Sequence, residues 1–486
     1  MSTAASPSTN PHHARRWAIL ALLGMAQLMV VLDGTVVNIA LPSAQADLGF
    51  SDASRQWIIT AYALAFGSLL LFGGRLADVM GRKTVLLIGL VGFGVASTVG
   101  GFAPNFEVLV GARAAQGLFG ALLAPAALSL LTTTFTDPDE RGKAFGIYGA
   151  IAGAGAAIGL ILGGVLTEYL SWRWCLYINL VLAVPAAVAA FGLLVNQRPA
   201  GKARLDLLGT VVVSAGLLGI VYGCSKAQSD GWTSTTTLGL LLGGLVLVAI
   251  FVLIELRVAN PLLPMRVVLD RSRGGSYLGL GLACVGMFGV FLFLTYYLQS
   301  TLHYSPIKTG FAFLPMVVGI MVMATLSTAV LLPKLGGRLP IVLGMVLASI
   351  GMLLFTQIGV DTGYVSHVLP GLVVMGLGLG LLFSTCFELG TSGVEAHDAG
   401  VASAMANTTQ QIGGSIGTAL LSTIAATSAA SFLAAGSGDE IAAAVHSYSM
   451  AFWVSAGIFA VSAVACGLLL PGGVHAREQT GAPAEG

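Results

Sequence analysis

Long apolar segments occupy most of this chain, and they constrain its fold more than any other feature. A helix needs about 20 mainly apolar residues to cross the hydrocarbon core of a membrane. Fourteen such segments follow one another, at residues 17–39, 57–76, 84–103, 108–131, 143–167, 173–195, 206–226, 235–256, 276–299, 310–332, 339–359, 365–387, 401–426 and 449–470. We therefore predict an all-α integral membrane protein, because the strands of a membrane β-barrel would be only about 10 residues of alternating polarity.

The composition supports this prediction. Hydrophobic residues make up 56% of the 486 positions and charged residues only 9%, whereas soluble domains are about 45–50% apolar. The five cysteines are scattered without close pairs, so neither a disulfide framework nor a metal cluster is predicted.

The positions of lysine and arginine predict the topology. An even number of spans places both ends of the chain on one side. With the N-terminus inside, seventeen of the 22 basic residues fall on the cytoplasmic side, while only Arg55, Arg173, Lys226 and Lys308 fall outside and Arg113 lies within a span. This bias predicts a multi-pass protein of the cell membrane with both termini in the cytoplasm. The abundance of alanine and glycine hints at a bacterial source.

Charged linkers at 196–205 and 257–275 divide the spans into six, two and six. The predicted parts are an N-terminal tail (1–16), an N-terminal six-helix bundle (17–200), two inserted helices (201–260), a C-terminal six-helix bundle (261–470) and a C-terminal tail (471–486). Gly81-Arg82 and Gly337-Arg338 occupy similar places in the two bundles, which suggests a duplication. Such repeats place a substrate site at the membrane midplane between the halves.

A basic stretch, Gly74-Arg-Leu-Ala-Asp-Val-Met-Gly-Arg-Lys83, joins the second and third spans. It resembles the loop signature of the major facilitator superfamily, Gly-x-Leu-Ala-Asp-x-x-Gly-Arg-Lys. The resemblance implies that Asp78, Arg82 and Lys83 form a gating loop, whose charges bridge helices in one state and release them in another. A latch of this kind is the bistable element that alternating access requires.

The first span contains a carboxylate in Leu32-Asp-Gly-Thr-Val-Val-Asn-Ile-Ala-Leu-Pro42. An ionised Asp33 inside a bilayer costs about 2.5–3.5 kcal/mol, so it should face a polar cavity, find a partner or take up a proton. The run resembles the first-helix signature of the fourteen-helix drug:proton antiporters, which implies that Asp33 couples transport to protons. A structural aspartate that bonds the backbone or Thr35 is the alternative.

Arg113, in Gly111-Ala-Arg-Ala-Ala-Gln-Gly-Leu-Phe-Gly120, is a cation inside a span and must be compensated. Gln116 lies one turn away, on roughly the same face. The pattern resembles the fourth-helix signature Arg-x-x-Gln-Gly of the superfamily, which implies a part in proton transfer. A structural role, in which Arg113 tethers backbone carbonyls or Asp33, is as good an interpretation.

The fifth span carries glycines at spacings that let helices pack tightly. Gly155 and Gly159, with Gly163 and Gly164, resemble the antiporter signature Gly-x-x-x-Gly-Pro-x-x-Gly-Gly, which implies conformational gating. Leu160 stands where that family has proline, so this helix should be less kinked.

Several polar residues in other spans could contact a substrate. We expect the cavity to be lined by Asn38, Gln116, Gln299, Glu388, Asn407, Gln410 and Gln411. Polar residues also hold membrane helices together, so lining a cavity and packing remain alternatives for the amides. Glu388 could instead be a solvated residue at the cytoplasmic interface.

These patterns predict a proton-coupled exporter of small hydrophobic or cationic compounds such as drugs or antibiotics. The alternative is uptake or uniport of a small metabolite, which Leu160 favours slightly. We expect no cofactor besides the coupling proton, no nucleic-acid partner and a monomer in the lipid bilayer. The sequence contains no nucleotide-binding loop, no metal-ligand spacing and no nucleophile elbow that would indicate an enzyme. It also contains no filter motif that would indicate a channel.

Overall fold

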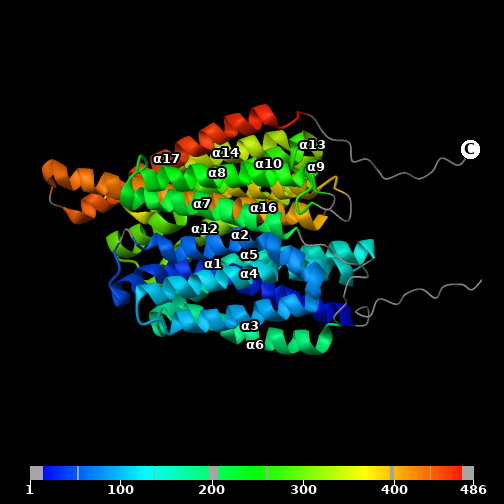
Figure 1. Cartoon of the computed structure of the whole chain (residues 1–486). Coiled ribbons are helices and arrows are strands. Elements are labelled where there is room, and N and C mark those ends of the chain that lie inside the picture. Colours follow the sequence, from blue (N-terminus) through cyan, green and yellow to red (C-terminus); the bar gives the residue numbers. More distant parts are fainter. Residues whose placement is uncertain are drawn as a thin grey trace, which may run out of the picture.

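The computed structural model describes residues 15–51, 54–135, 137–195, 206–258, 261–394, 399–437 and 439–472. Within these ranges every regular element is a helix. The long helices run roughly parallel, and α1 begins at the same end of the bundle at which α17 finishes (Figure 1). We refer to this end as the terminal end and to the opposite one as the far end.

The N-terminal half consists of six helices joined by short connections. They are α1 (Arg16–Leu48), α2 (Gln56–Met80), α3 (Arg82–Gly101), α4 (Phe106–Thr134), α5 (Pro138–Tyr169) and α6 (Trp174–Leu193). The Gly74–Lys83 stretch is therefore helical except at Gly81, whose φ of 91° breaks the path of the chain between α2 and α3. Glycine adopts such an angle without steric cost. The predicted loop is thus a single residue.

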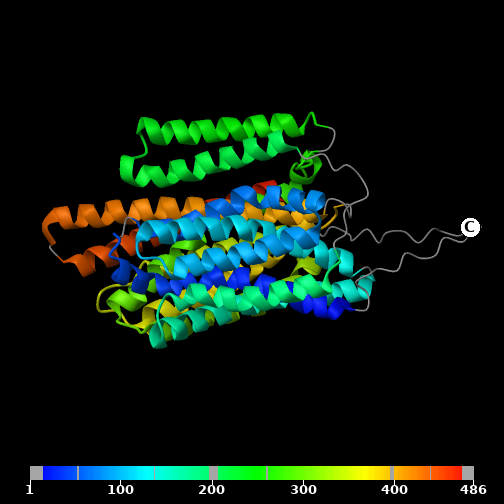
Figure 2. The same ribbon diagram turned by 60° about the horizontal axis from the view of Figure 1, so that its bottom comes forward.

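Two helices, α7 (Leu207–Asp230) and α8 (Thr235–Glu255), form a hairpin on one side of the bundle. Figure 2 shows this hairpin at the edge of the bundle, where α7 packs against α2 and α16 (Ala399–Phe432). Asp206 caps α7 and Ser234 caps α8, each accepting a hydrogen bond from a backbone N–H of the first turn.

The C-terminal half is less regular, because four of its elements are short π-helical turns, where functional sites are often found. It comprises α9 (Met265–Val268), α10 (Arg271–Tyr296), η2 (Tyr297–Thr301), α11 (Pro306–Ala312), α12 (Leu314–Leu326), η3 (Ser327–Leu331), α13 (Leu332–Leu335), α14 (Arg338–Phe355), η4 (Tyr364–Val368), α15 (Leu369–Thr391), α16 (Ala399–Phe432), η5 (Leu433–Ser437) and α17 (Glu440–Leu469). Gly81-Arg82 and Gly337-Arg338 each begin a helix, α3 and α14, as the suggested duplication requires.

Each of the fourteen predicted segments corresponds to one helix or to a series of adjoining helices. Eleven helices in the described ranges are long and apolar enough to span a membrane, and shorter apolar stretches lie in α2, α5 and α7. The all-helical membrane fold is therefore confirmed. The count of fourteen spans and the domain boundaries stay predictions, and the tails 1–14 and 473–486 lie outside the described residues.

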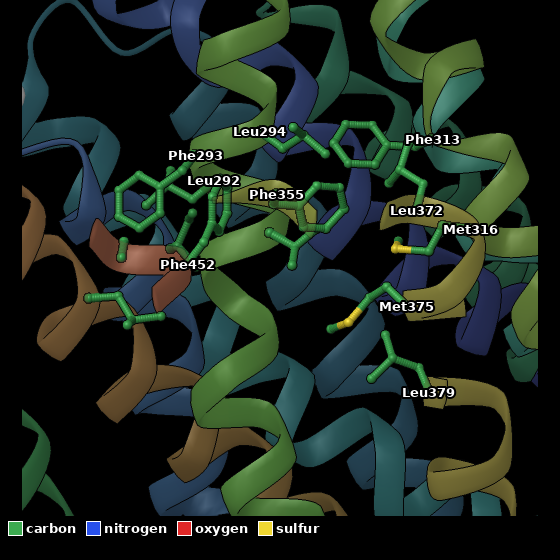
Figure 3. Close-up of a cluster of buried hydrophobic side chains, with 14 of the residues drawn as sticks. Leu292, Phe293, Leu294, Phe313, Met316, Phe355, Leu372, Met375, Leu379 and Phe452 are labelled. Carbon is green, nitrogen blue, oxygen red and sulfur yellow. The ribbon is translucent and has the colours of Figure 1, made fainter. Parts of the chain in front are cut away.

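The core consists of aliphatic and aromatic side chains packed between the helices. Figure 3 shows part of it in the C-terminal half, where Phe293 and Phe452 lie together and Met316 and Met375 belong to the same cluster. The same apolar cluster includes Leu32 and Val36 of α1, so the two halves share a continuous core beside Asp33.

Candidate functional site

Asp33 lies near the middle of α1, and its side chain is fully buried. Its Oδ2 atom forms an ion pair with Nη1 of Arg113, on α4, at 2.5 Å. Arg113 is only 2% exposed. The two charges that the sequence places within the membrane therefore compensate one another, as one of the two interpretations of Arg113 allows.

Further contacts hold the Arg113 guanidinium in place. Its Nε donates to the carbonyl oxygen of Ile58 at 3.0 Å, and Nη1 also donates to Oε1 of Gln116 at 2.9 Å. The ring of Tyr62 lies under the guanidinium, with its centroid 4.5 Å away. A cation over an aromatic face is stabilised further when both are desolvated.

The second carboxylate oxygen of Asp33 accepts two hydrogen bonds from amides. Gln116 Nε2 donates at 2.9 Å and Asn179 Nδ2, on α6, donates at 2.8 Å. Gln116 Nε2 also contacts Ser97 Oγ, on α3, at 2.6 Å. The network thus joins five helices of the N-terminal half around one ionisable group.

The network retains unused polar capacity. The Tyr62 hydroxyl and Asn179 Oδ1 are buried and have no hydrogen-bond partner among the described residues. A small cavity of about 10 Å³ lies beside Arg113 and is lined by Val37, Ile58 and Trp172 among others. This space suits about one water molecule.

Sequence reasoning identified Asp33, Arg113 and Gln116 but missed Asn179, Ser97 and Tyr62 as members of the site. Asn179 stands in the Tyr177-Ile-Asn179 run, and an amide within an otherwise apolar segment was the available signal. An uncharged polar side chain in a membrane helix usually seeks a partner. Ser97 and Tyr62 carry no comparable signal.

We predict that Asn179→Leu weakens proton-driven transport. The variant removes one donor to the Asp33 carboxylate, and hydrogen bonds to charged groups contribute about 1.5–3 kcal/mol. Since about 1.4 kcal/mol corresponds to a factor of ten, the rate of gradient-driven transport should fall by about tenfold or more. Transport measured in proteoliposomes with an imposed pH gradient tests this. Ser97→Ala is the control, because it leaves all contacts of Asp33 intact, and an unchanged transport rate in Asn179→Leu would contradict the prediction.

The predicted gating residues make contacts within the N-terminal half. Lys83 Nζ donates to the carbonyl oxygens of Phe191 and Leu194, at 2.8 and 2.6 Å, and so caps the end of α6. Arg82 is partly buried at the start of α3, while the Asp78 side chain lies outside the described residues. The latch role of these charges stays a prediction.

The glycines of α5 pack against α1. A β-carbon at Gly155 would lie 3.1 Å from Leu28, and one at Gly159 would collide with Thr35. Both contacts lie within one half of the molecule, so they explain the glycines by packing and leave their gating role a prediction. No described proline interrupts α5, which is one continuous helix past Leu160.

The residues predicted to line a cavity are dispersed. Gln116 is fully buried in the Asp33 network, and Gln299 Nε2 donates to the carbonyl oxygen of Ile39 at 3.1 Å. Asn38 retains a buried Oδ1 without a partner. Glu388 is exposed near the terminal end of α15, which agrees with the interfacial alternative.

Asn407, Gln410 and Gln411 are partly buried along α16. The side chain of Gln411 packs at Gly67 of α2, where a β-carbon would lie 2.9 Å from it. These amides therefore lie on a helix that joins the two halves, and their role as cavity lining stays a prediction.

The halves also meet at the far end, through polar contacts. The Tyr296 hydroxyl, on α10, donates to Gln45 Oε1 of α1 at 2.5 Å, and the Ile307 N–H donates to Glu168 Oε2 at 3.1 Å. The buried Arg55 guanidinium lies over the Tyr296 ring, 4.1 Å from its centroid. These contacts and the Gln299 hydrogen bond link the halves at the far end of the bundle.

Two glycines bring the halves into backbone contact at the same end. A β-carbon at Gly310 of α11 would collide with the Leu160 carbonyl of α5, and one at Gly164 would lie 2.7 Å from the Pro306 carbonyl oxygen. The far end is therefore closed in this conformation along the line where α5 meets α11.

A helical membrane bundle with a charge pair buried among its helices has the architecture of a secondary transporter. The sequence model of the Major Facilitator Superfamily matches residues 23–418, so the chain belongs to this superfamily. The match confirms both the resemblance predicted from the motifs and the fold that it implies.

Its relatives include exporters and resistance proteins. The chain is 49% identical to the puromycin resistance protein of Streptomyces alboniger, over 96% of this chain and 94% of the relative. It is 39% identical to the cephamycin export protein of Amycolatopsis lactamdurans, over 83% of this chain and 84% of the relative. It is 32% identical to a multidrug efflux pump of Mycolicibacterium smegmatis, over 86% of this chain and 82% of the relative.

Proposed function

We propose that this protein is a proton-coupled antiporter that exports small hydrophobic or cationic compounds, such as drugs or antibiotics, by alternating access. The observation that carries the proposal is the Asp33 carboxyl, which is fully buried and bound by Arg113, Gln116 and Asn179. A carboxyl inside the membrane can take up and release a proton during each cycle, whereas an arginine stays charged throughout.

Protonation of Asp33 changes the forces within the network. The ionised carboxyl attracts Arg113 through an ion pair and accepts three hydrogen bonds. A neutral carboxyl loses the ion pair and leaves the buried cation with weaker partners, which are the Ile58 carbonyl, Gln116 Oε1 and the Tyr62 ring. Proton binding therefore favours a different arrangement of α1 and α4, and this difference couples the proton to the conformation.

The contacts at the far end supply the gate. With both termini in the cytoplasm of a bacterial cell, the far end faces outward, and the contact of α5 with α11 closes the outward path. Separation of these contacts would open the carrier to the outside. The polar contacts are few, and the backbone contacts occur at only two glycines, so separating them costs a moderate free energy. Such an interface can adopt two discrete arrangements.

The relatives favour antibiotics as substrates. The names of the two most similar relatives cited above refer to puromycin and cephamycin, so puromycin is the first compound to test. We expect no cofactor other than the coupling proton, no enzymatic activity, and a monomer as the working unit.

Proteoliposomes with an imposed pH gradient test the proposal. We expect puromycin or a fluorescent hydrophobic cation to move against its concentration gradient only while the pH gradient lasts. A pH-sensitive dye should report proton movement in the opposite direction when substrate is added. Substrate that merely equilibrates, with no proton movement, would contradict antiport.

Uptake or uniport is the second candidate, because Leu160 replaces the proline of the antiporter signature. The direction of transport in cells separates the two candidates. Expression of an exporter lowers the accumulation of a fluorescent cation, whereas expression of an importer raises it.

A further inference from the structure

A pair of acidic groups lies at the terminal end of the α7–α8 hairpin, away from Asp33. Glu255, the last residue of α8, is only 4% exposed, and Asp206 caps the start of α7. A β-carbon added at Gly209 would meet Asp206 Oδ2 and Glu255 Oε1 at once. The two oxygens therefore face the same point.

Each carboxyl uses one oxygen in a defined contact. Asp206 Oδ1 accepts the Gly209 N–H at 2.8 Å, which caps α7, and Glu255 Oε2 accepts the Leu263 N–H at 2.8 Å. Among the described residues, no donor meets the other oxygens, Asp206 Oδ2 and Glu255 Oε1, which are both buried.

The surroundings make two negative charges unfavourable here. An apolar cluster of Val213, Phe251, Leu262 and Leu263 packs at the same end of the hairpin. Two carboxylates close together in a desolvated place repel strongly, and such pairs hold one proton in common.

The described charged groups on neighbouring segments do not neutralise the pair. Arg257 and Arg266 are exposed, and Arg273 donates to the carbonyl oxygens of Val267 and Arg266 and lies 3.8 Å from Asp270. The described start of α16, residues 399–405, carries no titratable side chain. None of the described arginines forms a hydrogen bond or an ion pair with Asp206 or Glu255.

We propose that Asp206 and Glu255 bind one proton between them, and that this proton joins the start of α7, the end of α8 and the connector at Leu263. The protonated carboxyl donates a hydrogen bond from its buried oxygen to the buried oxygen of the other carboxyl, which satisfies both. A cation is a poorer occupant, because Na⁺ or Ca²⁺ needs several more oxygen ligands than these two atoms provide.

Infrared difference spectroscopy of the full-length protein in lipid nanodiscs tests this site at neutral pH. Glu255→Gln and Asp206→Asn each remove one carboxyl while supplying an amide donor to the other, and asparagine still caps a helix. We expect the carbonyl band of a protonated carboxylic acid in the wild type and its loss in either variant. The band should shift in D₂O and survive in Asp33→Asn, since it belongs to a separate site.

The matched control is Glu107→Gln, which removes an exposed carboxyl and should leave the band unchanged. A band that persists in both Glu255→Gln and Asp206→Asn would overturn the proposal, as would difference spectra that contain only carboxylate bands. Carboxylate bands that move when sodium is exchanged for choline would show a bound cation instead and would equally overturn it. Because Asp206→Asn preserves the cap, a folding failure of Glu255→Gln alone would leave the test intact.

Discussion

Replacing Asp33 with asparagine should abolish gradient-driven export while substrate exchange at equal pH continues. Asparagine keeps an oxygen for Arg113 and a similar shape, but it cannot take up a proton. The carrier then has no group through which the gradient can act. Export is measured in proteoliposomes with and without a pH gradient. Gradient-driven export by the variant should fall to the level of empty vesicles.

Loss of the Asp33 charge should also lower stability, and this effect needs separating from coupling. Removing one partner of a buried ion pair costs about 3–5 kcal/mol, because the other charge is left uncompensated. The double variant Asp33→Asn with Arg113→Gln removes both charges and should recover much of the melting temperature of the wild type. Its export should stay absent. Gradient-dependent export by either folded variant would refute the coupling role of Asp33.

The outcome at this site shows what the sequence can and cannot predict. Asp33 and Arg113 stand out because a charge within an apolar span must be compensated. Their pairing was one of several options, because spacing along the chain does not determine which helices meet. Asn179 shows the same limit, since its helix had to be placed beside α1 before its amide could be assigned to the carboxylate.

The gating residues illustrate a second limit. Gly155 and Gly159 were predicted to gate, yet their visible contacts are to α1 in the same half, whereas Gly164 of the same motif meets the other half. Small residues at helical spacing predict close packing without naming the partner helix. The sequence identifies Arg55 only as a cation on the predicted outer side. Its position over the Tyr296 ring depends on how the two halves pack together, which the sequence does not show.

The closed far end leads to the second large effect, which we expect at Gly310. A methyl group there would collide with the Leu160 carbonyl, and a backbone atom cannot move aside as a flexible side chain can. Overpacking of this kind costs about 1–3 kcal/mol, and that cost falls only on the closed state. Gly310→Ala should therefore shift the equilibrium toward the state open at the far end by about 5- to 150-fold, with a comparable fall in export.

Accessibility of a cysteine at position 38 reports this shift directly. All five native cysteines are buried, so an Asn38→Cys variant labelled from the far end should give little background. Labelling should be faster when Gly310→Ala is added. The matched control is Gly457→Ala, because a β-carbon at Gly457 meets no atom within 4 Å, and labelling and export should stay as they were. Equal labelling rates with and without Gly310→Ala would mean that the contact of α5 with α11 is packing alone, and the gate would then have to lie elsewhere along the interface of the two halves.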